Sequence, residues 1–541
     1  MKARTPRKPL VEANLLDKAI AYFNPKLAQR RQHAREVLAL SGGYTGARVD
    51  RAALANWRTS AGSPNTDIIG DLPMLRSRSR DQMRNAPIAL GALNITASHS
   101  VGTGLSCNPA INAAILGLSD EAAEAWQLKT RARFEVWARS KACTLDRRQD
   151  FYQLQGLDYR STKESGDSFV LTPLMERDGQ RMLVLQLIEA DRVCNPDRKA
   201  DTETLVDGIE LSPETGEAVA VHVAKHHPGD RLVKNTWERR EVRGANTGRR
   251  NVLHSYKLLR PGQVRGVPWI APILEPLKQL SQYTDAELKA AVDSAVTSFF
   301  TEMDPDAFAE LYDESAQDKL IAEGQKWDGN VAGNNKVVNL LPGEEIKNLT
   351  PGRPNPQFDP FVLAILRQIG AALEIPFEVL IMHFQSSYTA ARGAFMMAWK
   401  FFRMERDMVV TEKCQPVYEL WLENEVSQGL ISARGFFADP IVRAAWCGAV
   451  WTGDGPGSVD PGKDVAAAEK RVALGISTKQ AESILHDGVD WETKHRQRVK
   501  ETNAEKRDGI WAAPPGSPAP EQNAQPARTS SNGSDDDTET D

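Results

Sequence analysis

Residues Gly457 to Lys463 (GSVDPGK) have the spacing of a phosphate-binding loop, GxxxxGK. In such a loop, backbone N–H groups surround the phosphates, the lysine reaches them, and a following Ser or Thr hydroxyl binds Mg²⁺. Here Asp464 takes the place of that hydroxyl, and Pro461 removes one N–H donor. No clear strand leads into the segment. We therefore expect no nucleotide site, but a loop and then a helix that begins near Lys463, with Asp460 and Pro461 at its N-terminus.

Three histidines, His222, His226 and His227, raise the question of a metal site. Valines alternate with other residues through positions 219–224, which is the period of a strand. Residues four apart in a strand lie about 13 Å from each other, so His222 and His226 could not share one ion. We expect surface histidines and no metal ligands. The chain also lacks HExxH, GxSxG and GxGxxG motifs.

An enzyme site assembled from distant segments stays open as an alternative. Carboxylates could combine with His254 or His383 into a nuclease or protease site, although no spacing singles one out. The five cysteines lie far apart without a CxxC pair, which is typical of reduced thiols. They are Cys107, Cys143, Cys194, Cys414 and Cys447. We predict no catalytic residue and no cofactor.

Composition indicates an ordinary soluble protein of several domains. The chain has 541 residues, of which 67 are Lys or Arg and 72 are Asp or Glu, for a net charge of −5. A protein that grips nucleic acid tightly usually carries a basic domain, so such binding is not indicated. Basic runs at 76–80 and 494–498 are expected to be solvated helix faces. There is no signal-peptide core and no long apolar run, so we expect no membrane contact and synthesis in a cytoplasm.

The N-terminal half is predicted to mix helices with short strands. Helices are expected on either side of Pro87, over residues 119–141, where Ser119 can cap the N-terminus, and over residues 150–163. Short runs of alternating apolar residues then follow, separated by Gly, Pro and Asp, which is typical of strands. They occupy residues 168–175, 181–193, 206–230 and 250–259.

The C-terminal half is predicted to be mainly helical, which makes the chain an α+β protein. Apolar residues at three- or four-residue steps predict a long amphipathic helix over Pro272–Phe300. A mixed region ending in strands is expected next, then a helix over residues 360–373, a loop over 377–387, and a helix from Tyr388 to about Lys413. Further helices are expected up to residue 507.

Several stretches, taken in order, resemble the lambda-like family of tailed-bacteriophage portal proteins. They are residues 83–105, 186–196, 208–230, 254–291, 384–410 and 458–478. The specific part is the combination of RPGQ-RG-P, beginning at Arg260 and followed by a long helix, with SSY-AAR opening another helix at Ser386. The resemblance runs from about Leu75 to Glu505.

The resemblance implies a portal-type fold with a wing, a helical stem, an inserted clip and a mainly helical crown. Carried onto this chain, residues 1–60 are a basic, loosely ordered arm, and 61–270 are the wing, helices first and then the β-rich block. The stem and its insert follow as the first stem helix at 271–300, the clip at 301–356 and the second stem helix at 357–375. The remaining regions are the tunnel loop at 376–387, a wing helix at 388–414, a helical crown-side region at 415–512 and a disordered acidic tail at 513–541.

The function implied by the resemblance is a ring-shaped DNA conduit at one capsid vertex, used for genome packaging, head–tail joining and DNA ejection. The expected partners are about eleven further copies of the chain, the terminase large subunit, the major capsid protein, a scaffold or protease, head–tail connector proteins and double-stranded DNA that passes non-specifically. The expected location is the portal vertex of the virion, with assembly in the host cytoplasm. The alternatives are another virion structural protein, such as a head–tail adaptor, or the enzyme considered above.

Six residues are candidates for contact with DNA in the channel. They are Lys278 and Lys289 on the first stem helix, and His383, Phe384, Gln385 and Ser386 in the tunnel loop. The lysines could equally face outward into solvent, and Phe384 could equally be buried between subunits. The neighbouring residues 380–382 are expected to pack within the protein. A conduit should be only sparsely basic because dense Lys/Arg contacts would slow sliding, and the net charge permits this.

Overall fold

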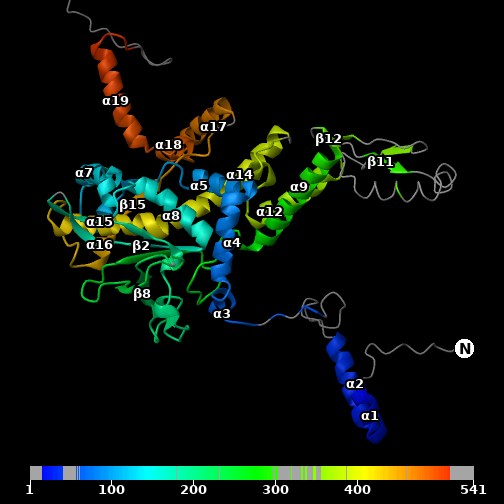
Figure 1. Ribbon diagram of the computed structural model, residues 1–541. Coiled ribbons are helices and arrows are strands. Elements are labelled where there is room, and N and C mark those ends of the chain that lie inside the picture. Colours follow the sequence, from blue (N-terminus) through cyan, green and yellow to red (C-terminus); the bar gives the residue numbers. More distant parts are fainter. Residues whose placement is uncertain are drawn as a thin grey trace, which may run out of the picture. The chain divides into compact units, whose positions relative to one another are not determined.

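The chain divides into two compact units, Met1–Ser63 and Pro64–Asp541. The computed structural model describes residues 15–40, 56–57, 59, 61–177, 179–230, 232–295, 299–302, 319, 330–332, 335–337, 345–348, 355–384, 387–457 and 460–511. The first unit contains helices α1 (Leu15–Phe23) and α2 (Pro25–Leu40), and the other elements belong to the second unit (Figure 1). No helix within these described ranges has the length and apolarity to cross a membrane. The predicted acidic tail, 513–541, lies outside the described residues.

The second unit begins with helices whose ends follow from local sequence. The break at Pro87 is confirmed, because Ala86 is extended and proline takes the first helical position of α5, where no N–H donor is needed. Ser119 Oγ accepts a hydrogen bond from the N–H of Ala122, and Asp150 forms a capping box with Gln153, as helix starts require. The helices are α3 (Pro64–Ile68), α4 (Leu72–Asn85), α5 (Pro87–Ser100), α6 (Ala113–Leu116), α7 (Asp120–Arg139) and α8 (Phe151–Ser165).

The predicted β-rich block forms antiparallel sheets. A three-stranded sheet has the order β10-β2-β5, a four-stranded sheet has the order β6-β7-β8-β9, and β3 pairs with β4. The strands are β2 (Asp167–Leu171), β3 (Leu174–Arg177), β4 (Gln180–Leu183), β5 (Gln186–Ile188), β6 (Leu205–Val206), β7 (Ile209–Leu211), β8 (Ala218–Ala224), β9 (Trp237–Glu241) and β10 (Val252–Tyr256). Strand β9 was not predicted, because its sequence WERRE has no apolar alternation.

Helices dominate the rest of the second unit. They are α9 (Leu274–Ala295), α12 (Phe358–Ala372), α13 (Phe377–Leu380), α14 (Tyr388–Val409), α15 (Gln415–Ser427), α16 (Pro440–Trp446), α17 (Pro461–Ala473), α18 (Lys479–Asp487) and α19 (Trp491–Arg507). A π-helical segment, Val410–Cys414, joins α14 to α15 just before Pro416, which has no N–H to donate. Short strands complete the unit: β1 (Ser106–Pro109), β11 (Phe299–Glu302), β12 (Asn330–Ala332), β13 (Asn335–Val337), β14 (Glu345–Asn348) and β15 (Ala449–Thr452).

Two predicted boundaries in this half are wrong. The helix predicted up to Phe300 ends at Ala295, and Phe299–Glu302 instead pairs with β14, because the aromatic Phe299-Phe300 pair favours a strand. The predicted loop 377–387 contains the short helix α13.

Three apolar clusters form the core of the second unit. One surrounds α7, α8 and α15 and is rich in aromatic rings, and a second lies among α4, α5, α9, α12, α13 and α14. The third lies between the three- and four-stranded sheets. The second cluster is the one that fixes the long helices expected to form a stem.

Candidate DNA-channel segment

Helices α9 and α12 lie side by side (Figure 1). The Tyr283 ring stacks on Phe358 with centroids 5.6 Å apart and meets Phe361 edge-on at 5.0 Å. Asn355 Nδ2 donates a hydrogen bond of 2.7 Å to Glu287 Oε1. The residues that flank the expected clip, 301–356, are thus brought together and held by aromatic and polar contacts.

Lys278 and Lys289 both lie on α9, where their side chains are exposed. They are eleven residues apart, which is close to three helical turns, so they share one side of the helix about 16 Å apart. Neither forms an ion pair with a described residue. Leu288 and Val292 are also exposed, at 66% and 56%, so the exposed side of α9 offers two cations and an apolar surface.

The expected tunnel loop is only partly covered by the described residues. His383 is exposed and Phe384 is 53% exposed, whereas Gln385 and Ser386 lie outside the described residues. The expectation that residues 380–382 pack within the protein is right for Leu380, which is 4% exposed, and wrong for Met382, which is 70% exposed. The loop therefore presents a methionine and an aromatic ring to its surroundings.

The RPGQ-RG-P motif contributes Arg265 to a buried ionic cluster with Asp167, Asp207 and Arg76, which we call the hub. The Arg265 guanidinium is fully buried and contacts Asp167 Oδ2 at 2.6 Å and Asp207 Oδ2 at 2.7 Å. It also donates to the carbonyl oxygens of Ala190 and Val193, both at 2.9 Å. A planar guanidinium can satisfy several acceptors at fixed angles, which a lysine cannot do.

A second arginine completes the hub around Asp167. Arg76 Nη2 lies 3.0 Å from Asp167 Oδ1, and both side chains are buried. Burial alone would raise the pKa of the Asp167 carboxyl, but Arg265 and Arg76 hold that pKa far below its usual range. The Asp167 carboxyl therefore links α4, β2 and the segment leading to α9.

Two glycines allow the backbones at the hub to touch. Gly166 has a φ of +94°, and a Cβ on Gly266 would stand 2.0 Å from the carbonyl oxygen of Gly166. Gln263 closes the turn by accepting from the N–H of Leu259 at 2.9 Å and donating to the carbonyl of Arg265 at 2.7 Å. The motif is therefore a joint between the β-rich block and α9.

Another buried pair ties α8 to α14. Lys163 Nζ lies 2.5 Å from Glu405 Oε2, and both side chains are at most 4% exposed. Burial lowers the pKa of the Lys163 ammonium, and Glu405 opposes that shift. The N–H of Trp269 donates to the carbonyl of Lys163 at 3.0 Å, so the segment before α9 is bound at the same point.

The GxxxxGK match does not form a phosphate loop. Helix α17 begins at Pro461 with Asp460 as its cap, as predicted, and Lys463 Nζ pairs with Asp460 Oδ2 at 2.9 Å. The prediction that no strand leads in is wrong, since β15 ends at Thr452, but β15 pairs antiparallel with β1 and is separated from α17 by eight residues. Asp464 pairs with Arg392 on α14.

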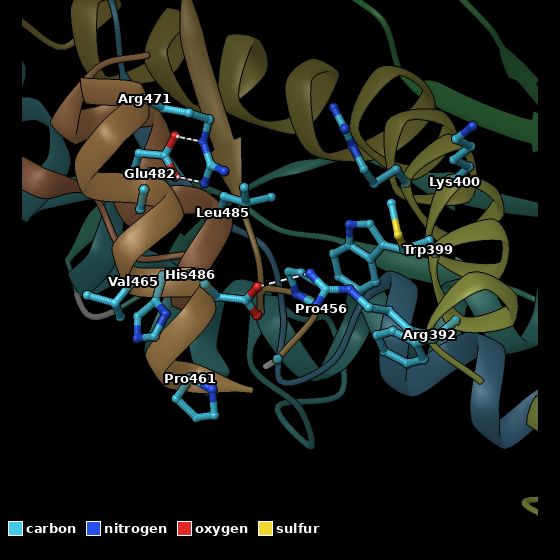
Figure 2. Close-up of a pocket in the computed structure, with 16 residues that line it drawn as sticks. Arg392, Trp399, Lys400, Pro456, Pro461, Val465, Arg471, Glu482, Leu485 and His486 are labelled. Atoms are coloured by element: carbon cyan, nitrogen blue, oxygen red, sulfur yellow. Dashed lines mark hydrogen bonds and ion pairs between the residues drawn. The ribbon is translucent and has the colours of Figure 1, made fainter. Parts of the chain in front are cut away.

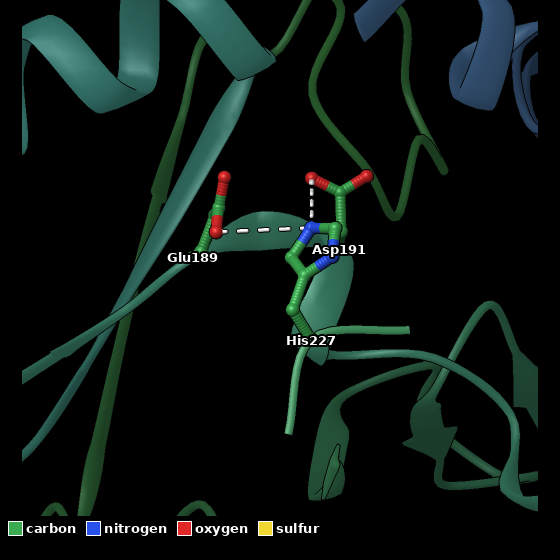
Figure 3. Close-up of side chains that lie close together, drawn as sticks. All are labelled: Glu189, Asp191 and His227. Carbon is green, nitrogen blue, oxygen red and sulfur yellow. Dashed lines mark ion pairs between the residues drawn. The ribbon is translucent and has the colours of Figure 1, made fainter. Parts of the chain in front are cut away.

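Of the three histidines, only His222 lies in β8, and the strand ends before His226 and His227. The prediction that one strand separates His222 from His226 is therefore wrong in its geometry. His227 Nε2 lies 3.8 Å from Glu189 and 3.9 Å from Asp191 (Figure 3). Arg80 also pairs with both carboxylates, so its guanidinium already supplies positive charge beside Glu189 and Asp191.

Comparison with known proteins decides the family. A family model described as phage portal protein, lambda family, matches residues 50–406. The chain belongs to this family. Portal protein B of Escherichia phage lambda is 24% identical over 490 residues, which cover 85% of this chain and 90% of that protein. The portal protein of Escherichia phage N15 has the same identity and coverage, and the probable portal protein of Halomonas phage phiHAP-1 is 23% identical over 462 residues, 84% of each chain.

Solved structures give a more distant likeness. A chain from the neck of a native gene transfer agent particle, computed with C12 symmetry, is 14% identical with a TM-score of 0.40, and the likeness covers 70% of this chain and 93% of that chain. The resemblance to portal proteins and the mixed helix-and-sheet fold class are confirmed.

His254, a candidate for an enzyme site assembled from distant segments, packs against the hub. His254 Nε2 lies 3.3 Å from Asp167 Oδ2, and the ring is stacked between Phe169 and Tyr256 at 4.1 and 4.5 Å. A catalytic pair would need a nucleophile at the other ring nitrogen, and no hydroxyl or thiol among the described residues bonds to it. His383 forms no ion pair with a described carboxylate.

The sequence did not indicate which carboxylates Arg265 of the RPGQ-RG-P motif contacts. Asp167 and Asp207 lie 98 and 58 residues before Arg265. The signal in the sequence was an arginine inside an otherwise uncharged stretch, VRGVPW, which precedes an amphipathic helix. The motif therefore indicates the family from sequence, whereas the buried contacts of Arg265 are visible only in the structure.

Proposed function

We propose that about twelve copies of this chain close into a ring around a channel for duplex DNA at one capsid vertex. The observation that carries the proposal is the continuous family match over residues 50–406, which includes the hub, α9, α12 and nearly all of α14. The ring serves genome packaging, head–tail joining and DNA ejection. It is a passive conduit without catalytic residues or cofactors, and a terminase supplies the chemistry.

The regions of the chain are assigned to the ring as follows. Helices α9 and α12 form the stem, and residues 301–356 form the clip between them. Residues 61–270 and α14 belong to the wing, 376–387 form the tunnel loop, and 415–512 lie on the crown side. The contact between α9 and α12 supports this assignment, and so do Leu288 and Val292, since a neighbouring subunit would cover their exposed side chains.

Lys278 and Lys289 line the channel in this proposal. A ring of about twelve copies would carry two levels of ammonium groups about 16 Å apart. Duplex DNA carries one charge about every 1.7 Å, so two levels attract the polyanion without gripping it along its length. His383 and Phe384 are the loop candidates, together with Gln385 and Ser386.

The ring is tested with the purified full-length chain. Light scattering should give a particle of about 720 kDa, since each chain has a mass of 59.7 kDa, and negative-stain images should show a central hole. ATP turnover should be absent. A monomer both in solution and in purified particles, or turnover of ATP by the chain alone, would overturn the proposal.

The channel assignment has its own test. Lys278→Glu together with Lys289→Glu should leave ring assembly intact but lower the yield of packaged DNA, because two levels of repulsion replace two of attraction. Lys129→Glu is the matched control, since Lys129 is exposed on α7. Equal packaging by the double variant and the control would place the lysines on an outer, solvated face.

Further partners belong to the same proposal. They are the terminase large subunit, the major capsid protein, a scaffold or protease and head–tail connector proteins, met first in the host cytoplasm and then in the virion. Immunogold labelling of particles should find the chain at one vertex only, and labelling at many vertices would contradict this location.

A further inference from the structure

An apolar groove runs between α14 and the helix pair α17–α18. Phe395, Met396 and Trp399 line one wall, and Val465 and Leu485 line the other, around a volume of about 550 Å³ (Figure 2). A second hollow of about 850 Å³ continues along α14 and shares Trp399 and Leu485 with the first. Met396, Val465 and Leu485 are each at least 46% exposed, so a contiguous apolar surface faces outward.

Two ion pairs brace the walls of this groove. Arg392 on α14 contacts Asp464 on α17 at 3.0 Å, and Arg471 on α17 makes two contacts of 2.8 and 2.6 Å with Glu482 on α18 (Figure 2). Arg471 meets both carboxylate oxygens of Glu482, and this forked geometry restricts the relative position of α17 and α18. The groove is therefore a formed feature of the subunit and has no need of a ligand to open it.

The rim of the groove carries two cationic side chains on α14, and the exposed carboxylate of Asp407 lies further along the same helix. Lys400 and Arg403 are exposed on α14, line the groove, and form no ion pair with a described residue. An occupant that suits this site has an apolar part for the floor and carboxylates for the rim.

The segment from Glu374 to Phe384 of this same chain has that composition. Met382 and Phe384 are 70% and 53% exposed, and Glu374 has a half-exposed carboxylate whose nearest described cation, Lys257, is 3.9 Å away. Glu378 supplies a second carboxylate on α13. None of these residues lines the groove of its own subunit.

We propose that residues 374–384 of one subunit dock into the α14/α17–α18 groove of the adjacent subunit. This inference rests on the proposed ring. The contact joins two different surfaces of identical chains, which is the heterologous contact that generates a ring when its rotation closes. Phe384 and Met382 fill the apolar floor, so Phe384 is buried between subunits in this arrangement and His383 is the described loop residue left for DNA contact. Glu374 and Glu378 face Lys400 and Arg403. Methionines on both sides, Met382 and Met396, let the two surfaces adapt to each other.

Cross-linking in the full-length chain tests the contact. The variant Phe384→Cys with Met396→Cys should give, on mild oxidation, a ladder of covalent oligomers on a non-reducing gel, because a disulfide forms only between closely placed residues. Phe384→Cys with Val465→Cys probes the opposite wall. The matched control is Phe384→Cys with Met397→Cys, since Met397 is 69% exposed on the same helix but outside the groove.

The mass of each particle is measured in parallel by light scattering, which separates the two proposals. A ladder from either groove pair, and none from the control, supports the docking. Rings without a ladder from both groove pairs, or a disulfide confined to single chains, would overturn the docking and leave the portal ring intact. Absence of rings from the wild-type chain would instead overturn the proposed function.

Charge reversal gives a second, independent test. Lys400→Glu with Arg403→Glu should lower the ring-to-monomer ratio at least about tenfold, and Glu374→Lys with Glu378→Lys should do the same. Combining all four changes should restore rings, which a merely misfolded variant could not do. Lys470→Glu, on α17 outside the groove, is the control. Failure of the combined variant to form more rings than either parent would refute the pairing of these charges.

Discussion

Replacing Arg265 with methionine removes the centre of the buried hub while keeping a side chain of similar length. The change leaves the carboxyl of Asp167, which is fully buried, without its closest partner at 2.6 Å. Breaking a buried ion pair costs about 3–5 kcal/mol, because the remaining charge stays desolvated. Arg76 still contacts the other oxygen of Asp167, so we expect the lower end of that range, about 3 kcal/mol.

Hydrogen exchange is the suitable assay, because it measures the local stability of individual strands, which one unfolding curve for a chain with three core clusters would average. At pH 7, amides of β2 and β10 should exchange about 100-fold faster in Arg265→Met than in the wild type, since 1.4 kcal/mol corresponds to a factor of ten. Arg148→Met is the control. Its partner Asp146 is 3.7 Å away, the two side chains are 84% and 59% exposed, and such a pair contributes less than about 1 kcal/mol.

One outcome of the exchange experiment would refute a stabilising role of the hub. If exchange in β2 and β10 changed no more in Arg265→Met than in the control, the hub would not stabilise these strands. Arg265→Lys separates charge from geometry. A lysine keeps the charge but reaches fewer acceptors, so protection should recover only in part, and full recovery would show that the forked guanidinium is unnecessary.

Three further predictions concern other parts of the fold. Gly166→Ala should speed hydrogen exchange of the β2 amides, because its φ is +94° and a Cβ would stand 2.5 Å from the carbonyl oxygen of Gly266. Gly156→Ala, with open space inside α8, should stabilise that helix by about 0.5–1 kcal/mol and slow its exchange. Lys463→Ala should leave ring assembly and DNA packaging unchanged, and loss of packaging by intact rings would revive a phosphate-binding role. Burial lowers the pKa of His254 in the folded chain, so the unfolded chain takes up a proton first as pH falls below about 6.5, and stability should decrease from pH 7 towards 5. His254→Gln should flatten that part of the profile, and an unchanged slope would contradict the assignment.

Elements fixed by local contacts were predictable from sequence. Ser119 and Asp150 mark the starts of α7 and α8, because each caps a helix with its own side chain. Strand β9 was missed because its pairing with β8 is non-local and its exposed face is charged. The end of α9 was misplaced because periodicity continues past Ala295, where pairing with a strand more than forty residues later takes over.

The candidate DNA-channel segment and the groove differ in the same way between what local sequence predicts and what contacts between distant segments decide. The positions of Lys278 and Lys289 on one side of a helix follow from spacing alone. The groove cannot be predicted from spacing, because its walls come from residues 392–403 and 456–486, and no periodicity links these two segments. Its rim charges look in sequence like any solvated lysine and arginine. They stand out only once the structure shows that their neighbours on α17 and α18 are already paired with one another or with Arg392.

A ring places a demand on the hub that a monomer would not. In the proposed ring, about twelve identical contacts close a circle only if each subunit turns the next by about 30°. A small error in the angle between the β-rich block and α9 would be repeated at every contact. Buried ion pairs add little net stability compared with apolar packing, but they fix one geometry, since a displaced guanidinium leaves several acceptors unsatisfied. Arg265 joins the β-rich block to the segment leading into α9, and Lys163 binds that segment to α14. The buried ion pairs of Arg265 and Lys163 therefore lie where the orientation of α9 relative to the β-rich block is set. The proposed contact between subunits instead relies on an adaptable apolar groove. With ion pairs inside the subunit and an apolar groove between subunits, neighbouring subunits can adjust to one another while the angle within each subunit, on which closure of the proposed ring depends, stays fixed.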